Sequence, residues 1–594
     1  MIRDNRKVEE HWMRNWRLVS VFAILALVLA ACGNGGVSPS ADGSEPAEES
    51  EGPAPSQDGT AFEAMSYPED GPAECGTDTN PSNISEIRAE DEHTVVFTLC
   101  APDVAFLPKI AFSAFGIDDT AWLEQYGADG SIIENVNGTG PYSLEAWNRG
   151  SDITLTANPD YWGDAALSGT AIFRWSTEAA QRLVELQSGA VDGIDNPGPD
   201  EFETIQGDSN LALYEREGLN TLYFGFNNNP QIEGFDNEAN PFANEQVRQA
   251  LAMGIDREQI LNDFYPPGSE VATHFTPCSI PFACEGEEWY EFDREAAIEM
   301  LADAGYADGF ETTIHYRPAV RGYLPAPPQV AAALQAQLEE MGITATIDEQ
   351  DDTAYLDNAD AGLLDGIHLL GWGADYPDPT NFLDYHFGAG ASAQFGDTFD
   401  DITGPLAEGA ASVDDADRAA AYEAANNAIK QHVPMIPIVH GGSAVAFQAA
   451  NEGAHASPLS NEALSVISPG DDDQLVFMQN AEPGGLYCAD ETDGEALRVC
   501  EQLKESLYAY EIGGTEAIPA LAEECAPNDD LTEWTCTLRQ GVTFHDGAAF
   551  DANDVVLSYA VQWDAAHPLH VGRDGSFTYF SALWGGFLNP PPAE

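Results

Sequence analysis

The stretch QVAAALQAQLEEMGITATI, residues 329–347, decides the fold class of this 594-residue chain. Its first part, 329–341, places apolar residues at helical spacing and predicts an amphipathic helix. Gly342 ends this helix, and residues 343–347 predict a strand. A helix that leads directly into a strand is the building unit of an α/β protein.

Segments of the same two kinds alternate along the rest of the chain. Helices are predicted at 179–188, 246–261, 294–304, 414–432, 495–508 and 552–563. Strands are predicted at 93–99, 152–156, 433–439 and 474–479, with a hairpin at 525–539. The alternation predicts an α/β fold with mixed sheets. The chain is too long for one core, so we expect two or more lobes, and we find no internal repeat.

The N-terminal segment has the features of an export signal. Arg14 and Arg17 precede an apolar run over residues 18–31, which is too short for a membrane span of about 20 residues. The run ends in Leu-Ala-Ala-Cys32, which is similar to a bacterial lipobox. We therefore expect a lipid on Cys32 that anchors the protein outside the cytoplasmic membrane, on the cell surface or in the periplasm. The alternative is an ordinary secretory signal with a chance cysteine. Residues 33–60, rich in Ser, Gly, Pro, Ala and Glu, predict a disordered acidic tether.

Acidic residues dominate the composition. The chain has 101 Asp and Glu against 22 Lys and Arg, a formal net charge of −79. Such a surface repels nucleic acid and anionic lipid, so we expect neither as a partner. The charge is spread along the whole chain, which favours an adaptation to salty or alkaline surroundings over the attraction of a cationic ligand. The sequence leaves the cause of the acidity open.

Eight cysteines follow Cys32, and an even number in an exported chain suggests disulfides. Their spacing favours pairing between near neighbours, although the sequence does not prove the connectivity. No pair has the two-residue spacing of a zinc knuckle and no histidine cluster lies nearby in the sequence, so we expect no metal site. The expected pairs are Cys75–Cys100, Cys278–Cys284, Cys488–Cys500 and Cys525–Cys536.

Six short motifs carry a family resemblance. They are GTGPY at 138–142, NPDYWG at 158–163, VRQAL with IDR at 247–257, AGYADGF at 304–310, GWGADYPDP at 371–379 and LRQGVTFHDG at 538–547. Each motif is weak alone. Together they make the chain resemble the extracytoplasmic solute-binding proteins of peptide-type ABC importers, the family 5 relatives of dipeptide- and oligopeptide-binding proteins.

The order of the segments departs from that of the family. The segment that resembles the family's N-terminal part, 475–589, comes last, and the usual C-terminal part, 433–467, lies in the middle. Each piece occurs once, so we expect a circular permutation across the acidic turn at 468–473; the alternative is a truncated or misassembled reading frame. The expected parts are a signal at 1–32, a tether at 33–60, a first lobe from 61–230 and 446–594, and a second lobe at 231–445.

The resemblance implies a two-lobe clamshell of the large peptide-binding subclass, which closes over its ligand by a hinge motion. It implies no catalysis and no cofactor. The monomeric protein would capture a peptide or similar organic solute and deliver it to the membrane permease of an ABC importer. Relatives also bind nickel complexes, sugars and other solutes, so the ligand stays open. Two other functions remain: a sensory or adhesive lipoprotein with this fold, and a secreted peptide hydrolase, for which no credible nucleophile–base pair is present.

The candidate ligand site centres on GWGADYPDP. In peptide-binding members of the family, the aspartate at this motif position accepts the α-ammonium of the ligand, which makes Asp375 the candidate anion. The alternative is that Asp375 caps the following turn, a role that Asp378 fits better. Trp372 and Tyr376 flank Asp375 and are candidate cleft walls, with burial in the lobe core as the alternative for Trp372.

Basic residues and catalytic motifs near this region are weaker signals. Arg317 and Arg321, in the loop HYRPAVRGYLP, are candidates to bind a ligand carboxylate, but a surface ion pair is the favoured alternative. His545 and the following Asp-Gly predict a hairpin turn rather than a catalytic group. The HGGS segment at 440–443 has no Gly-x-Ser-x-Gly elbow beside it, so we expect no catalytic residue.

Overall fold

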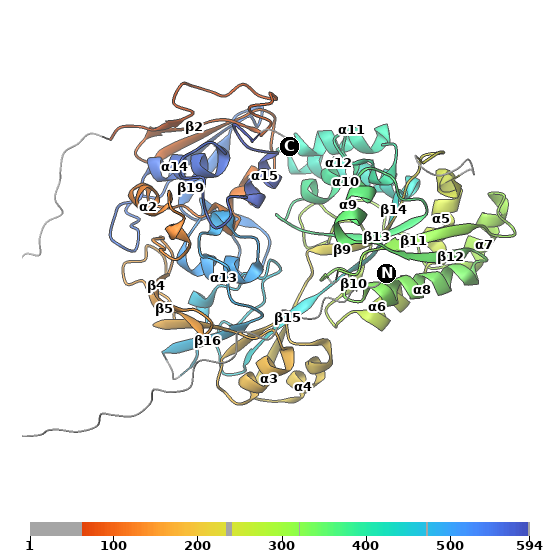
Figure 1. Ribbon diagram of the computed structural model, residues 1–594, viewed down its shortest axis with the longest axis horizontal. Helices are drawn as coiled ribbons and strands as arrows, with labels where there is room; N and C mark the ends of the chain where they lie inside the picture. The colour runs from red at the N-terminus through yellow and green to blue at the C-terminus, as the bar shows by residue number, and fades with distance from the viewer. Residues whose placement is uncertain (1–61, 233–239, 320, 471–472, 592–594) are drawn as a thin grey trace, which may run out of the picture. The chain divides into compact units, whose positions relative to one another are not determined.

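The computed structural model describes residues 62–232, 240–319, 321–470 and 473–591 (Figure 1). The predicted export signal, Cys32 and the whole of the predicted tether lie outside the described residues. None of the described helices is both long and apolar enough to span a membrane.

A seven-stranded mixed sheet combines strands from distant parts of the chain. Its order is β4 (Tyr142–Asn148), β5 (Asp152–Ala157), β6 (Thr170–Trp175), β16 (Gln474–Gln479), β7 (Gly193–Asp195), β15 (Ser443–Gln448) and β8 (Leu211–Arg216). β16 is parallel to both of its neighbours, and the other pairs are antiparallel. Two clusters of buried apolar residues pack on this sheet, one of them with α3 (Ala179–Gln187) and α4 (Phe202–Gly207). The strand that follows the acidic turn is therefore internal to a sheet built from earlier segments.

A five-stranded antiparallel sheet also joins the two ends of the described chain. Its order is β1 (Ser66–Tyr67), β2 (Ile84–Asp91), β3 (Thr94–Leu99), β20 (Glu533–Leu538) and β19 (Ala522–Pro527). The buried helix α14 (Ala552–Trp563) packs on β2 and β3 (Figure 1), and a capping box between Asp551 and Asp554 fixes its start. Smaller elements complete this part: α1 (Phe106–Ile110), α2 (Thr120–Tyr126), α13 (Gly494–Leu503), β17 (Tyr508–Tyr510), β18 (Ala517–Pro519) and α15 (Thr578–Trp584).

The middle of the chain forms a six-stranded mixed sheet. Its order is β10 (Glu270–Val271), β14 (Met435–His440), β9 (Asn220–Phe226), β13 (Ile367–Gly373), β11 (Glu311–Tyr316) and β12 (Thr344–Glu349). The helices of this part are α5 (Glu245–Gly254), α6 (Arg257–Phe264), α7 (Arg294–Asp303), α8 (Pro327–Glu340), α9 (Asp352–Asp360), α10 (Tyr385–Phe387), α11 (Asp400–Ala410) and α12 (Asp415–His432). Its largest apolar cluster fills the space between sheet and helices. β9 belongs to this sheet, although the sequence-based boundary at residue 230 assigns it to the first lobe.

The predicted α/β class with mixed sheets is confirmed. The deciding stretch folds as expected, because α8 ends before Gly342 and β12 follows it. The φ of Gly342 is +82°, a conformation that glycine adopts readily and residues with a Cβ rarely adopt. β12 then pairs in parallel with β11.

Two predicted helices differ from the structure. The single helix expected at 246–261 is broken into α5 and α6, because the Asp256 side chain accepts a hydrogen bond from the backbone N–H of Gln259 and starts a new helix. The helix expected at 495–508 ends at Leu503. Beyond it the backbone carbonyls of Glu505 and Leu507 accept hydrogen bonds from distant segments, with Ile117 and Ala522 as donors. Long-range pairing thus overrides the local helical pattern.

The four expected cysteine pairs are all present as disulfides. They join Cys75 to Cys100, Cys278 to Cys284, Cys488 to Cys500 and Cys525 to Cys536. The last pair links facing residues of the β19–β20 hairpin.

Candidate ligand site

Asp375 lies just after β13 and is held by Asn381. The backbone N–H of Asp375 donates to Asn381 Oδ1 at 2.9 Å, and Asn381 Nδ2 donates to Asp375 Oδ2 at 3.0 Å. The Trp372 indole N–H donates to the same Asn381 oxygen at 3.2 Å. Asn381 lies in a single π-helical turn, Thr380–Asp384. One amide thus orients two of the residues predicted for the site.

The environment of Asp375 suits the binding of a cation. Burial raises the pKa of Asp375, and the hydrogen bond from Asn381 opposes that rise. Among the described residues, no lysine, arginine or histidine forms an ion pair with it, and its Oδ1 accepts no hydrogen bond from them. A desolvated carboxylate of this kind gains most from a charged donor that enters with a ligand.

Trp372 and Tyr376 point into different surroundings. The half-buried Trp372 indole stacks on the ring of Tyr385, with centroids 4.2 Å apart. Tyr376 is only 7% exposed and packs into the apolar cluster of the five-stranded sheet. The ammonium of Lys109 lies 5.3 Å from the Tyr376 ring centroid. Tyr376 therefore packs the motif against the apolar cluster of the five-stranded sheet.

Asp378 has the structural role that the sequence favoured for it. Its Oδ1 accepts hydrogen bonds from the backbone N–H and the hydroxyl of Thr380, at 3.0 and 2.8 Å. Arg418 Nη2 contacts both Asp378 oxygens, at 2.8 and 2.7 Å. This buried ion pair fixes the turn that follows Asp375.

The two candidate arginines differ in their surroundings. Arg317 is 8% exposed and donates to the hydroxyl of Tyr323 at 3.1 Å. The Tyr323 ring lies against Gly371, where a Cβ would be 2.2 Å from Tyr323 Cδ2. The Arg317 loop is thereby brought onto β13, one residue before Trp372. Arg321 is exposed and pairs through its backbone with Leu324 in a tight turn.

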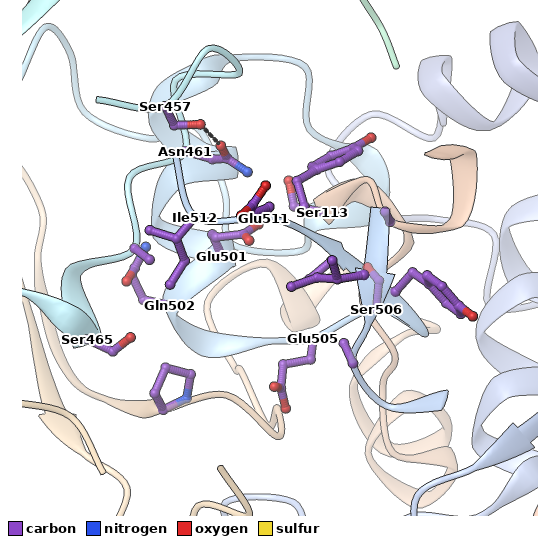
Figure 2. Close-up of a pocket in the computed structure, with 18 of the residues that line it drawn as sticks. Ser113, Ser457, Asn461, Ser465, Glu501, Gln502, Glu505, Ser506, Glu511 and Ile512 are labelled. Atoms are coloured by element: carbon purple, nitrogen blue, oxygen red, sulfur yellow. Dashed lines mark hydrogen bonds between the residues drawn. The ribbon is translucent and has the colours of Figure 1, made fainter. Parts of the chain in front are cut away.

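A separate pocket of about 230 Å³ was not anticipated from the sequence (Figure 2). Its walls include Glu501 and Glu505, together with Tyr161 and Trp162 of the NPDYWG motif. The Glu505 carboxylate accepts three hydrogen bonds, from the hydroxyls of Thr139 and Tyr161 and from the Trp162 indole, at 2.8 to 2.9 Å. The available signals were the four-residue spacing of the two glutamates and the adjacent aromatic pair.

His274 lies beside the Cys278–Cys284 disulfide, and the ligand atoms of the three residues are within 4.8 Å of one another. The loop thus places the ring of His274 beside this disulfide, a neighbour that was not anticipated from the sequence. The two sulfurs are bonded to each other, so they offer no thiolate to a metal ion.

His545 has a structural position. Its Nδ1 accepts from the backbone N–H of Gly138 at 3.2 Å, and its Nε2 donates to the carbonyl of Gly140 at 3.1 Å. Both ring nitrogens are therefore used to hold the GTGPY turn against the LRQGVTFHDG hairpin.

Comparison with known proteins places these features in one family. Residues 50–394 and 516–575 match the bacterial extracellular solute-binding proteins, family 5. The di/tripeptide-binding protein 3 of Pseudomonas aeruginosa is 30% identical over 392 residues, which cover 64% of this chain and 71% of that protein. The heme-binding protein A of Haemophilus influenzae is 26% identical over 397 residues, covering 65% and 70%. The structure of HbpA2 from Haemophilus parasuis matches with a TM-score of 0.59 and 28% identity, covering 64% of this chain and 74% of that one. The chain therefore belongs to the family 5 bacterial extracellular solute-binding proteins, a family of two-lobed binding proteins rather than enzymes.

Proposed function

We propose that this protein captures a short peptide and delivers it to an ABC importer, with Asp375 binding the α-ammonium group of the peptide. The observation that carries the proposal is the state of Asp375: a largely buried carboxylate, oriented by Asn381 and without a cationic partner among the described residues. Relatives named as di/tripeptide- and dipeptide-binding proteins favour a peptide over other solutes.

Two further groups complete the proposed site. Trp372, fixed by Asn381 and stacked on Tyr385, supplies an aromatic wall next to Asp375. Arg317 or Arg321 binds the peptide carboxylate, and Arg317 is the better placed because Tyr323 holds it against β13.

Ligand capture involves closure of the two lobes around the peptide. Tyr376 supports this step, because it extends from the loop after β13 into the apolar cluster of the five-stranded sheet and contacts Lys109 there. Such a contact stabilises the closed form and separates when the lobes open. A lipid on Cys32 holds the protein at the membrane, where the closed form meets the permease.

The altered segment order is a circular permutation in this proposal. β16 lies between β6 and β7, and β20 pairs with β3, so the last part of the chain completes sheets begun by the first part. A misassembled reading frame has no reason to supply strands in matching register.

Calorimetric titration with dipeptides tests the proposed function. We expect the soluble protein, starting at Gly33, to bind dipeptides, and Asp375→Asn to weaken binding by about 10- to 100-fold, as is usual when a hydrogen bond to a charged group is lost. Asp357→Asn removes one exposed carboxylate from α9 and is the matched control. Equal affinities of the two variants, or no binding across a broad dipeptide set, would contradict the proposal.

A further inference from the structure

The pocket of about 230 Å³ is lined by segments that are distant in the sequence. Asp375 is not among its lining residues, although the charge of Asp375 reaches Tyr510 in the pocket wall. Glu501 lies at the end of α13, Glu505 in the loop that follows, and Glu511 directly after β17. The 455–465 segment faces them with Ser457, Asn461 and Ser465, as Figure 2 shows. Tyr161, Trp162, Tyr508, Tyr510 and Ile512 add apolar surface. The cavity is thus acidic and aromatic at once.

The positive groups near this pocket donate hydrogen bonds to groups other than its glutamates, although the charge of Arg539 lowers the pKa of Glu505. The Lys504 ammonium donates to the buried carboxylate of Asp118. Arg539 stacks over the Trp162 ring at 4.1 Å and donates to the carbonyl of Ala520 at 3.0 Å. Over the described part of the chain, no lysine or arginine pairs with the three pocket glutamates.

The histidine of the pocket is also occupied. His455 Nδ1 donates to the carbonyl of Gly453 at 2.9 Å, and its Nε2 accepts from the backbone N–H of Ala463 at 3.2 Å. Both ring nitrogens of His455 are therefore used by the backbone of its own segment.

Glu501 differs from its neighbour Glu505 in how well its charge is stabilised. Glu505 accepts three hydrogen bonds from Thr139, Tyr161 and Trp162. Among the described residues, the group that lowers the pKa of Glu501 is the amide of Asn461, whose oxygen accepts a hydrogen bond from the Ser457 hydroxyl at 2.5 Å. Burial raises the pKa of Glu501 to about 7, and the Asn461 amide opposes that rise. Figure 2 shows Glu501 in the middle of the residues that surround the pocket.

A partly buried carboxylate with few donors is unfavourable unless a charged partner enters the cavity. A metal ion needs several oxygen or nitrogen ligands around one point. Among the described residues, the pocket glutamates form no such three-ligand group. The aromatic and aliphatic walls instead match an organic cation, whose ammonium also interacts favourably with ring faces.

We propose that this pocket binds a small aliphatic amine, with its ammonium group on Glu501 and its carbon chain along Tyr161 and Ile512. Glu505 and Glu511 add negative charge for a second ammonium group in a linear diamine. The site is separate from the proposed peptide site, since Asp375, Trp372 and Arg317 do not line the pocket. Binding at one site therefore does not require binding at the other.

The test is a calorimetric titration of the exported protein, starting at Gly33, with 1,5-diaminopentane at pH 8. We expect saturable binding, and none of the neutral analogue 1,5-pentanediol. Glu501→Gln is expected to weaken diamine binding by at least 10-fold. Glu523→Gln, which removes an equal charge from an exposed position on β19, is expected to leave it unchanged. This control separates a specific site from the general attraction of a strongly acidic protein.

Two further variants keep the outcome decisive. Ile512 is 53% exposed, so Ile512→Trp narrows the pocket without disturbing a core, and we expect it to weaken the diamine as well. Asp375→Asn is expected to leave diamine affinity unchanged, and Glu501→Gln to leave dipeptide affinity unchanged, so failure of either function is recognised separately. The absence of diamine binding, or equal affinities of Glu501→Gln and Glu523→Gln, would overturn the proposal.

Discussion

The guanidinium of Arg498 donates from Nε to Glu462 Oε2 at 3.1 Å, and neither residue is more than 1% exposed. Arg498 lies on α13, whereas Glu462 precedes the acidic turn at 468–473. Arg216 and Asp195 complete a buried network of two arginines and two carboxylates. Both segments that flank the turn are thus fixed to β7 and β8, independently of the turn itself.

Arg498→Met is expected to lower the free energy of unfolding by about 3–5 kcal/mol, because it leaves Glu462 and Asp195 buried with one cation fewer. The measurement is equilibrium unfolding in urea. Arg174→Met serves as the control, since the Arg174–Glu185 pair is partly exposed at 3.7 Å and such pairs contribute about 1 kcal/mol or less. A loss no larger than that of the control would show that the network is not stabilising.

Asp384 gives the fold a pH dependence that opposes ordinary acid denaturation. Burial raises the pKa of Asp384 to about 7, and the negative charges of Asp378 and Asp103 add to this rise. The positive charges of Arg418 and Lys109 oppose it. The folded protein thus holds a proton that the unfolded chain releases near pH 4, and this contribution is lost as the pH rises through 7. We expect Asp384→Asn to be more stable than the wild type at pH 8, by roughly 1–3 kcal/mol, and equally stable at pH 4.

Thermal unfolding from pH 4 to 9 checks this expectation. Asp397→Asn, at an exposed aspartate, controls for the loss of one negative charge from an acidic protein. A constant difference in melting temperature between Asp384→Asn and the wild type across this range would show that Asp384 does not titrate near neutrality.

Local sequence patterns predicted the elements but not the contacts between them. The stretch 329–347 contains its own stop signal, Gly342, so α8 and β12 follow from it directly. The end of α13 does not, because Glu505 leaves the helix to bind Ile117, Thr139 and Tyr161 from the other end of the chain. The local sequence pattern contains no information about contacts with segments so far away, so it could not predict that they would end the helix.

The candidate site shows the same limit. The motif GWGADYPDP places Trp372 and Asp375 close together whatever the fold. Tyr376, by contrast, packs into the apolar cluster of the five-stranded sheet. This position depends on Lys109 and its neighbours, which lie more than 260 residues earlier in the chain. The Glu501 pocket is likewise assembled from segments that are distant in the sequence, among them 111–113, 161–162, 455–465 and 501–520.

Asn381 acts as a positioning residue for the proposed peptide site. Its amide bonds both the Asp375 carboxylate and the Trp372 indole, so Asn381→Ala is expected to weaken dipeptide binding by about 10-fold, the effect of one hydrogen bond to a charged group. Titration calorimetry measures the affinity. Because the amide lowers the pKa of Asp375, the variant should also lose affinity at a higher pH than the wild type as the solution is acidified.

Asn358→Ala provides the control for this effect. Asn358 lies on α9 and donates to Gln350 at 3.1 Å. It forms no hydrogen bond with Asp375 or Trp372. Circular dichroism shows whether Asn381→Ala is folded. If the folded variant has the affinity and pH profile of the wild type, Asn381 does not position Asp375 and Trp372 for ligand binding.

Gly371 tests whether the close approach of Tyr323 to β13 matters for the arginine loop. A Cβ at Gly371 would meet Tyr323 Cδ2 at 2.2 Å and the Thr221 carbonyl at 2.5 Å, so Gly371→Ala must displace the ring or the strand. Overpacking of this kind lowers stability by about 1–3 kcal/mol. Since Tyr323 also accepts the hydrogen bond from Arg317, a displaced ring removes that contact to the guanidinium, and we expect weaker dipeptide binding. Gly373→Ala, two residues on in the same strand, has nothing within 4 Å of its Cβ and should change neither quantity. If both variants behave like the wild type, Tyr323 does not hold Arg317 in place. If only Gly371→Ala loses both stability and affinity, the absence of a side chain at Gly371 is required for Tyr323 to pack against β13.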